Sequence, residues 1–207
     1  MLALQPLKLC VIPDAWRLFS QRKNDQRFQD FSQRIFERDQ FTCQFCGFQA
    51  MEHQDVVNLD RNYYNNKLSN LLTACCFCAQ CFFLEAVGKD DNSGGTLIYL
   101  PEVTQNELNG FCHVLFCAMA NATNHRVDAQ NIYRSFKLRS HAVEKELGEG
   151  MSNPALLGQM LTDTPGKERT KIIDRILPSV RLLPSQSKFS KQIDDWAQGA
   201  VKELSGE

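Results

Sequence analysis

The sequence has no long hydrophobic run. Its N-terminal stretch, MLALQPLKLCVIPDAWRLF, is interrupted by Pro6, Lys8, Pro13 and Asp14, so its apolar segment is too short for a signal peptide. No later run is long enough to span a bilayer. We therefore expect a soluble protein that stays in the cytosol, and the integral membrane proteins are excluded.

The sequence also lacks an excess of charge of either sign. The whole chain has a net charge of −1, and residues 1–87 contain nine Lys or Arg and nine Asp or Glu. Nucleic-acid-binding grooves usually have a basic excess. Arg17, Arg22, Lys23 and Arg27 lie close together, but acidic residues are interleaved with them, which is typical of a solvated helix face. The charge pattern therefore argues against a nucleic-acid partner.

Apolar residues and cysteines, in contrast, are plentiful. The 207 residues are 43% hydrophobic and 23% charged, which is enough for a buried core and allows a second lobe. The chain has nine cysteines, an odd number, and most of them fall into two tight clusters. In a reducing compartment, such clusters indicate metal binding rather than disulfides.

The two clusters have the spacing of a zinc site. Cys43-x2-Cys46 is followed, after 28 residues, by CCFCAQC, which contains both Cys75-x2-Cys78 and Cys78-x2-Cys81. Two such turns can close a tetrahedral thiolate shell around one Zn²⁺ and leave no position for water. Iron–sulfur ligation is the alternative metal chemistry. The alternative without metal is that the cysteines are small buried side chains, which we expect of Cys10, Cys112 and Cys117.

Periodicity predicts regular structure on both sides of the first cluster. Asn24 or Asp25 can cap a helix that runs to about Arg38. A short strand is expected around Val56, followed by an Asn-rich irregular loop. The stretch CCFCAQCFFLEAV is typical of a helix from Cys75 to about residue 88. Zinc would therefore connect a loop to the start of a helix.

The stretch FERDQFTCQFCG, the residues SNLL at 69–72 and the Cys75-x2-Cys78 pair before a helix resemble the HNH endonuclease family. In that family, a ββα element is held by a four-cysteine zinc, and an asparagine-leucine pair begins five residues before the third cysteine. Asn70 stands in that relation to Cys75. The resemblance therefore implies that Cys81 faces the core and that zinc is bound by Cys43, Cys46, Cys75 and Cys78. The expected fold is α+β and mainly helical, an HNH-like ββα zinc-binding core with a helical C-terminal lobe.

The catalytic part of the HNH pattern is absent from the sequence. HNH nucleases place a general-base histidine on the strand after the first cysteine pair, and a metal-binding histidine or asparagine just after the fourth cysteine. Here those places hold VNLD at 57–60 and Ala79. His53 comes too early for the strand, and we interpret it as a surface histidine beside Glu52. We predict no catalytic residues and no enzymatic activity. The alternative function is an HNH-type metal-dependent nuclease or a nucleic-acid-binding zinc protein.

The chain extends well beyond an HNH unit, so we expect a zinc-binding core over 1–95 and a mainly helical lobe over 96–207. The stretch TLIYLPE predicts a strand, and Thr104 and Asp128 are expected to cap helices. Two more helices are expected to open at first-turn prolines, Pro154 and Pro165. Single histidines without ligand spacing are assigned to no site: His113, His125 and His141.

Two segments of this lobe indicate a surface for a partner. RILPSVRLLPS, residues 175–185, contains too many prolines for one helix, is too apolar for a free linker and is expected to pack along a surface. FSKQIDDWAQGAVKEL, residues 189–204, has apolar residues in helical register, either for packing within this protein or for docking on another one. The residues predicted to contact a partner are Leu177, Leu182, Leu183, Ile193 and Trp196.

A second resemblance covers essentially the whole chain, from the cysteine pairs through GTLIYLPEVTQNELNGFCHVLFCAMANAT to the helix with Trp196. It is to a subunit family of the coupling complex of the Dot/Icm type IVB secretion apparatus. This resemblance implies a non-enzymatic adaptor that binds the C-terminal segment of the coupling ATPase DotL, alongside DotM and the IcmS–IcmW adaptor. It also implies a role in recruiting effector proteins for export, and a cytoplasmic protein that meets the inner membrane only through its partners.

Overall fold

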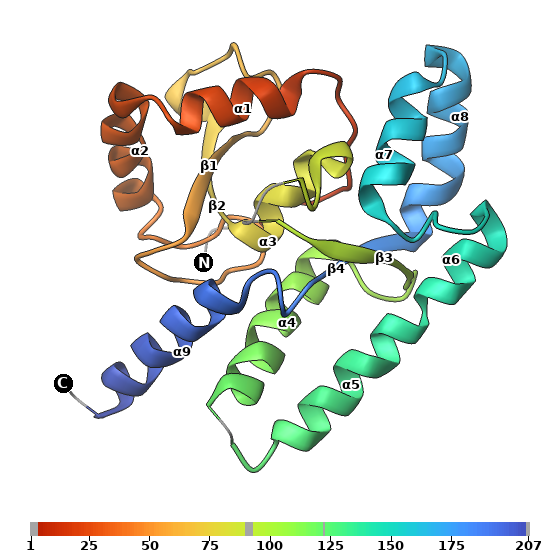
Figure 1. Ribbon diagram of the computed structural model, residues 1–207. Coiled ribbons are helices and arrows are strands. Elements are labelled where there is room, and N and C mark those ends of the chain that lie inside the picture. Colours follow the sequence, from red (N-terminus) through yellow and green to blue (C-terminus); the bar gives the residue numbers. More distant parts are fainter. Residues whose placement is uncertain (1–3, 90–92, 122, 206–207) are drawn as a thin grey trace.

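The computed structural model describes residues 4–89, 93–121 and 123–205. It is an α+β fold that is mainly helical (Figure 1). In chain order, the helices and strands are α1 (Ala15–Lys23), α2 (Gln26–Arg38), β1 (Gln54–Asn58), β2 (Leu71–Cys75), α3 (Cys76–Ala79), β3 (Gly95–Tyr99), α4 (Gln105–Ala120), α5 (Arg126–Leu138), α6 (Ser140–Leu147), α7 (Pro154–Asp163), α8 (Gly166–Ile176), β4 (Val180–Pro184) and α9 (Ser190–Ser205).

The strands form two small antiparallel sheets. β1 pairs with β2, in the register Gln54 opposite Cys75, and α3 follows β2 directly. β3 pairs with β4, in the register Gly95 opposite Pro184, so the chain returns to this sheet after five intervening α-helices, α4 to α8. In Figure 1, α1 and α2 lie beside the first sheet, α7 and α8 lie side by side, and α9 lies near α4. This order gives the β1–β2–α3 unit the ββα sequence of elements expected around the cysteines.

One large hydrophobic core connects the two halves of the chain. Its buried members come from both sides of residue 95 and include Phe19, Phe45, Phe77, Phe83, Leu97, Phe116, Leu182 and Phe189. A smaller cluster of Ile35, Val56 and Leu71 lies under α2. The division into domains at residue 95 stays a prediction, and the two proposed units share this core.

Several sequence predictions of local structure are confirmed. Asp25 caps α2 by accepting a hydrogen bond from the Phe28 amide (3.0 Å), and Thr104 forms a capping box with Glu107 at the start of α4. The predicted strands around Val56 and in TLIYLPE are β1 and β3. Asn153 caps α7, with Pro154 in the first turn. For the three helices, a capping side chain within the first turn is sufficient to set the residue at which the helix begins.

The helix predicted over 75–88 is wrong in extent. Only α3 is α-helical, and two 3₁₀ turns follow at Gln80–Phe82 and Leu84–Ala86. The Cys10 amide donates to the Cys81 carbonyl (2.9 Å), and the Cys10 carbonyl accepts from the Leu84 amide (3.0 Å). Because an α-helix would need the same backbone groups, this long-range pairing ends the helix early.

Three further predictions need correction. α5 begins at Arg126, two residues before the predicted cap Asp128, and α8 begins at Gly166 rather than at Pro165. The segment 175–185 does not simply lie along the surface, because its second half is the buried strand β4. The second strand of the ββα element was implied only by the HNH resemblance, without bounds, and the structure places it at Leu71–Cys75.

Candidate metal centre

The first cysteine pair lies in a tight turn after α2. The chain leaves α2 through Gln40 and Phe41, both in the left-handed region with φ of 53° and 52°. The Cys43 amide then donates to the Phe48 carbonyl (2.8 Å). Gly47, with φ of 76°, donates to the Cys43 carbonyl (3.0 Å). A glycine adopts this backbone conformation without steric cost, which explains why it follows the Cys-x2-Cys pair.

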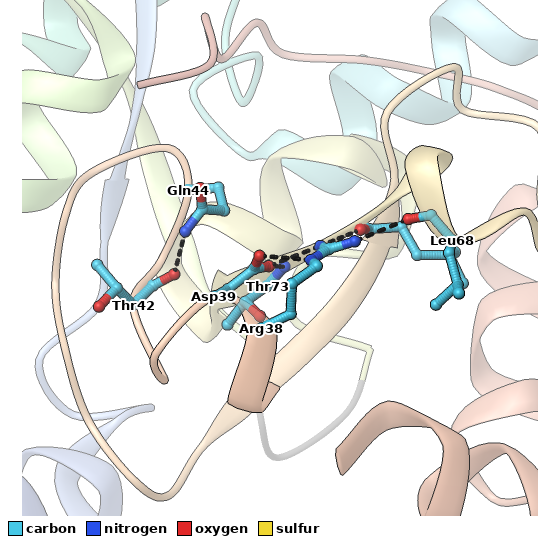
Figure 2. Close-up of polar contacts among 7 residues, drawn as sticks. Arg38, Asp39, Thr42, Gln44, Leu68 and Thr73 are labelled. Atoms are coloured by element: carbon cyan, nitrogen blue, oxygen red, sulfur yellow. Dashed lines mark hydrogen bonds and ion pairs between the residues drawn. The ribbon is translucent and has the colours of Figure 1, made fainter. Parts of the chain in front are cut away.

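A polar network connects this turn to β2 (Figure 2). Arg38, at the end of α2, donates two hydrogen bonds to the Asp39 carboxylate (2.8 and 2.9 Å) and others to the carbonyls of Leu68 (2.8 Å) and Leu71 (2.6 Å). The second Asp39 oxygen also accepts from the Thr73 amide (2.9 Å). Asp39 therefore orients the first cysteine turn relative to the strand that ends in Cys75.

The second cysteine pair joins the first in one cluster. Cys75 ends β2 and Cys78 lies in α3, and with Cys43 and Cys46 their Sγ atoms all lie within 4.8 Å of one another. The Sγ atoms of Cys46 and Cys75 are 3.6 Å apart. In a tetrahedral site with Zn–S bonds of about 2.3 Å, neighbouring sulfurs are about 3.8 Å apart. The donor set and its spacing therefore fit one tetrahedral metal ion.

Cys81 lies outside this cluster. Its thiol is buried and donates to the Phe77 carbonyl (3.3 Å), one helical turn earlier. This position agrees with the prediction that Cys81 faces the core.

The electrostatics of the cluster favour a bound cation. Cys43, Cys75 and Cys78 are fully buried, and Cys46 is half-buried. Burial, together with the neighbouring thiols, raises the pKa of Cys75 and of Cys78 well above the usual value. Burial also acts to raise the pKa of Cys43, but hydrogen bonds from the neighbouring thiols lower it well below the usual value. Because four such groups cannot all ionise together in a buried site, a divalent cation is the natural way to hold four thiolates.

Helix α4 supplies two polar side chains that the sequence analysis missed. The Asn109 amide nitrogen donates to Cys78 Sγ (3.2 Å), and His113 Nε2 lies 3.3 Å from Cys75 Sγ. Burial lowers the pKa of His113 to about 3, against the opposing charge of Cys43, so the imidazole is neutral at neutral pH. His113 was assigned to no site because it has no neighbouring ligand in sequence, and the structure corrects that interpretation.

Asn58 lies in the stretch 57–60, where the HNH resemblance would place a general base, and its contacts are structural. Asn58, at the end of β1, is fully buried and donates to the carbonyls of Asn62 (2.9 Å) and Asn65 (2.8 Å). Arg22 from α1 donates to Asn58 Oδ1 (2.5 Å) and to the Val56 carbonyl (2.7 Å). The amide of Asn58 therefore holds the Asn-rich loop, and its oxygen is bonded to a guanidinium.

His53 contacts α9 and is more than a surface histidine. Its Nε2 lies 2.7 Å from Asp195 Oδ2 and 3.9 Å from Glu52 Oε2, and Trp196 Nε1 donates to the Glu52 carbonyl (3.3 Å). The ligand atoms of Glu52, His53 and Asp195 lie within 4.8 Å of one another. Because His53 already bonds Asp195 and the Glu52 side chain is 76% exposed, we interpret this group as a polar clasp between the cysteine turn and α9.

The five residues predicted to contact a partner are in different environments. Leu182 and Leu183 on β4 are buried in the core, and Ile193 on α9 is buried as well. Leu177 and Trp196 are half-buried, and each lines a groove. Of the predicted set, Leu177 and Trp196 are therefore the residues that a partner could reach in this conformation. Partner binding at either position stays a prediction.

Comparison of the whole chain with known proteins identifies a relative. No family model matches the chain. The chain is 58% identical over 198 residues to the protein called Type 4 apparatus protein DotN of Legionella pneumophila subsp. pneumophila (strain Philadelphia 1). This alignment covers 96% of the chain and 92% of that relative. Because the two sequences agree across almost their whole lengths, the chain belongs to the DotN family.

Proposed function

We propose that the protein is a zinc-stabilised, non-enzymatic adaptor subunit of the Dot/Icm type IVB secretion coupling complex. The observation that carries this proposal is the identity of 58% to the type 4 apparatus protein DotN along 96% of the chain. The adaptor binds the C-terminal tail of the coupling ATPase DotL, alongside DotM and the IcmS–IcmW adaptor. In this way it supports the recruitment of effector proteins for export.

The zinc is structural, with Cys43, Cys46, Cys75 and Cys78 as its ligands. A four-thiolate shell is closed, so it supplies folding energy rather than a position for a reacting water. The burial of three of the four sulfurs supports this role. The β1–β2–α3 unit around the cluster is an HNH-like core, and residues 96–207 form the helical lobe attached to it.

The absence of a nuclease reaction follows from the chemistry of β1 and α3. Asn58 replaces the general base and is bonded to Arg22, and Ala79 replaces the second metal ligand after Cys78. An amide cannot accept a proton from water at neutral pH, and a methyl group cannot bind a metal. Non-enzymatic binding is therefore the function that these side chains favour.

The adaptor meets the inner membrane through its partners. Among the described residues, no helix is both long and apolar enough to cross a membrane.

The DotL tail binds in the groove that contains Leu177. This groove is lined by apolar side chains including Leu7, Leu9 and Ile173, and Lys8 and Arg61 add positive charge to it. An extended peptide must offset the entropy that it loses on ordering, and a long apolar lining with charged rims does so. Both grooves also contain charged residues, Asp174 and Arg181 in this one and Glu52, Asp195 and Lys202 in the groove with Met51 and Trp196. The groove with Leu177 is favoured because more aliphatic side chains line it.

Isothermal titration of the full-length protein with a DotL C-terminal tail peptide tests the proposal. Leu177→Glu should weaken binding by roughly tenfold or more, equivalent to about 1.4 kcal/mol. Met51→Glu is the matched control in the other groove, because the Met51 side chain is 72% exposed and can accept a charge without loss of folding.

If Met51→Glu weakens binding and Leu177→Glu does not, the tail binds the groove beside α9 instead. If the wild-type protein does not bind the peptide at all, the adaptor proposal is wrong. Truncation after Ser185 is a poor substitute for these variants, because Phe189 is completely buried and its removal would open the core.

A further inference from the structure

One face of α4 points at the cysteine turns. Asn109, Gly110 and His113 follow Asn106 by three, four and seven residues, which places all of them on the same side of a helix. The Asn106 side chain donates to the Phe45 carbonyl (2.6 Å), between the first two cysteines. Gly110 allows a close approach, since a Cβ there would lie 3.4 Å from the Cys46 carbonyl oxygen. This stripe therefore fits α4 against the first cysteine turn.

The other two residues of the stripe reach the sulfurs of the second pair. Asn109, which is completely buried, donates to Cys78 Sγ (3.2 Å) and to the Phe77 carbonyl (3.2 Å). His113 Nε2 lies 3.3 Å from Cys75 Sγ. A metal-bound thiolate can only accept a hydrogen bond, so the ring proton of His113 belongs on Nε2. With the metal bound, Asn109 and His113 therefore supply one N–H donor to each of two neighbouring sulfurs.

These contacts are the only evident reason for a histidine at this place. His113 is stacked between the rings of Phe48 and Phe77, with centroid distances of 3.6 and 4.3 Å, and is 7% exposed. Among the described residues, its Nδ1 atom has no hydrogen-bond partner. A buried polar group without partners costs free energy, and a phenylalanine would fill the same stack without that cost. The bond from Nε2 to the sulfur is what distinguishes histidine from phenylalanine here.

The hydrogen bond from His113 would stabilise the negative charge of a four-thiolate zinc centre. One Zn²⁺ with four thiolates carries a net charge of about −2, and the described sulfurs are mostly buried. Donors that bond to ligating atoms orient them and disperse their charge, and the loss of such a donor typically weakens metal binding by about 10–100-fold. Asn109 and His113 provide this for Cys78 and Cys75 from the far half of the chain.

We propose that Asn109 and His113 are positioning residues of the metal centre, and that α4 thereby couples metal binding to the order of the helical lobe. This inference rests on the proposed function of the four cysteines as metal ligands. α4 packs next to α3 and against α9 (Figure 1). Trp196 of α9 lies edge-on to the His113 ring, with the ring centroids 5.0 Å apart. A shift of the sulfurs would therefore be transmitted through His113 to the packing of α9.

The test compares metal binding by three variants of the full-length protein. His113→Phe keeps the stacked ring and removes the ring N–H donor. Asn109→Asp keeps the side-chain oxygen that accepts a hydrogen bond from Gln105 (2.9 Å) and replaces the amide N–H donor by a second oxygen. Both should release Zn²⁺ to a chelator more readily, with an affinity about 10–100-fold below that of the wild type. His113→Gln, which keeps an N–H donor at a similar reach, should recover most of that loss.

Substitution by Co²⁺ provides a readout that a packing defect would not change. The sulfur-to-cobalt charge-transfer band should shift in His113→Phe and in Asn109→Asp, because each removes a bond to a ligating sulfur. Leu115→Ala, a core change on another side of α4, should lower stability and leave the band in place. Unchanged Zn²⁺ release and an unchanged band in His113→Phe and Asn109→Asp would overturn the inference. A wild-type protein that binds neither Zn²⁺ nor Co²⁺ would instead overturn the metal assignment itself.

Discussion

At the scale of single residues, the cysteines of the second cluster have the same side chain but different contacts. Cys75 and Cys78 lie in the cluster of four sulfurs, whereas Cys81 bonds a backbone carbonyl. We predict that Cys75→Ser loses most of the bound zinc and much of the stability, because the closed thiolate shell contributes to folding. Cys81→Ser should retain about one zinc per chain. Elemental analysis of both purified variants decides between them, and the reverse result would mean that Cys81 is the ligand.

A buried carboxyl group should make the stability depend on pH. Burial raises the pKa of Glu85 from 4.5 to about 7, against the opposing effects of its own backbone amide and of Lys89. Below pH 4.5 the folded and unfolded states both hold the proton. Between pH 4.5 and 7 the unfolded state releases it while the folded state retains it, so the free energy of unfolding falls as the pH rises.

Glu85→Gln should remove this decrease and stabilise the protein at pH 8 by about 2 kcal/mol. Chemical denaturation at pH 5 and pH 8 measures the difference.

The carboxylate of Glu107 should have the opposite effect on the free energy of unfolding, because hydrogen bonds from the backbone and side chain of Thr104 lower its pKa. Glu107→Gln should therefore lower stability at neutral pH, and a stabilised Glu107→Gln would contradict this assignment.

The role of His113 could not be predicted from the local sequence pattern that predicted the cysteine site. Spacing alone predicts a four-cysteine site, because a chelating turn is local in sequence, but it leaves both Cys75-x2-Cys78 and Cys78-x2-Cys81 open as the second pair. The choice of Cys75 and Cys78 came from the resemblance to the HNH family. The contact of His113 with Cys75 spans 38 residues and depends on the packing of α4. A signal was nevertheless present, since Asn106, Asn109 and His113 form a polar stripe on an otherwise apolar helix. Such a stripe in a buried helix requires polar partners.

At the scale of elements, the close packing of α7 depends on one glycine. A Cβ at Gly158 would lie 2.4 Å from the Glu85 amide nitrogen, in the 3₁₀ turn Leu84–Ala86. Backbone atoms cannot move aside as a side chain can, so Gly158→Ala should destabilise the protein by about 1–3 kcal/mol. Gly199→Ala in α9 is the matched control. It meets nothing within 4 Å and should stabilise by about 0.5–1 kcal/mol. Urea denaturation compares the two, and equal effects would contradict this packing argument.

The elements that the sequence did not predict share a physical cause. β4 lies in a segment with two prolines, and it becomes a strand because β3 offers a partner more than 80 residues earlier in the chain. The helix predicted after Cys75 stops after Ala79 because Cys10 pairs with Cys81 and Leu84. The caps at Asp25 and Thr104 and the first-turn Pro154 were predicted correctly, since these signals act within a few residues. The predicted cap Asp128 and first-turn Pro165 were wrong by one to three residues. Long-range backbone pairing is not visible in local patterns.

At the scale of the whole molecule, the half with the cysteine cluster and the helical half share one interior. Phe77 from the cysteine region touches the rings of Phe116, Phe189 and Trp196 from the second half. Arg22 of α1 also donates to the Val56 carbonyl of β1, so α1 is tied to the first sheet, and the charge of residues 1–87 is balanced. The cysteine cluster and the helices of the second half are therefore parts of one packed unit.

The last prediction is that the zinc-loaded protein does not cleave DNA in the presence of Mg²⁺ or Mn²⁺. Loss of a general base typically lowers a rate by about 10²–10⁴-fold, and here the second metal ligand is missing as well. Asn58→His alone should not restore activity, because Arg22 already occupies the acceptor side of residue 58 and Ala79 still binds no metal. Plasmid cleavage assays should include Asn58→Ala purified in parallel to reveal contaminating nuclease. The contrary result is that the wild-type protein cleaves DNA in a metal-dependent reaction that is lost in Asn58→Ala. That result would show that Asn58 takes part in catalysis and that the proposal of a non-enzymatic protein is wrong.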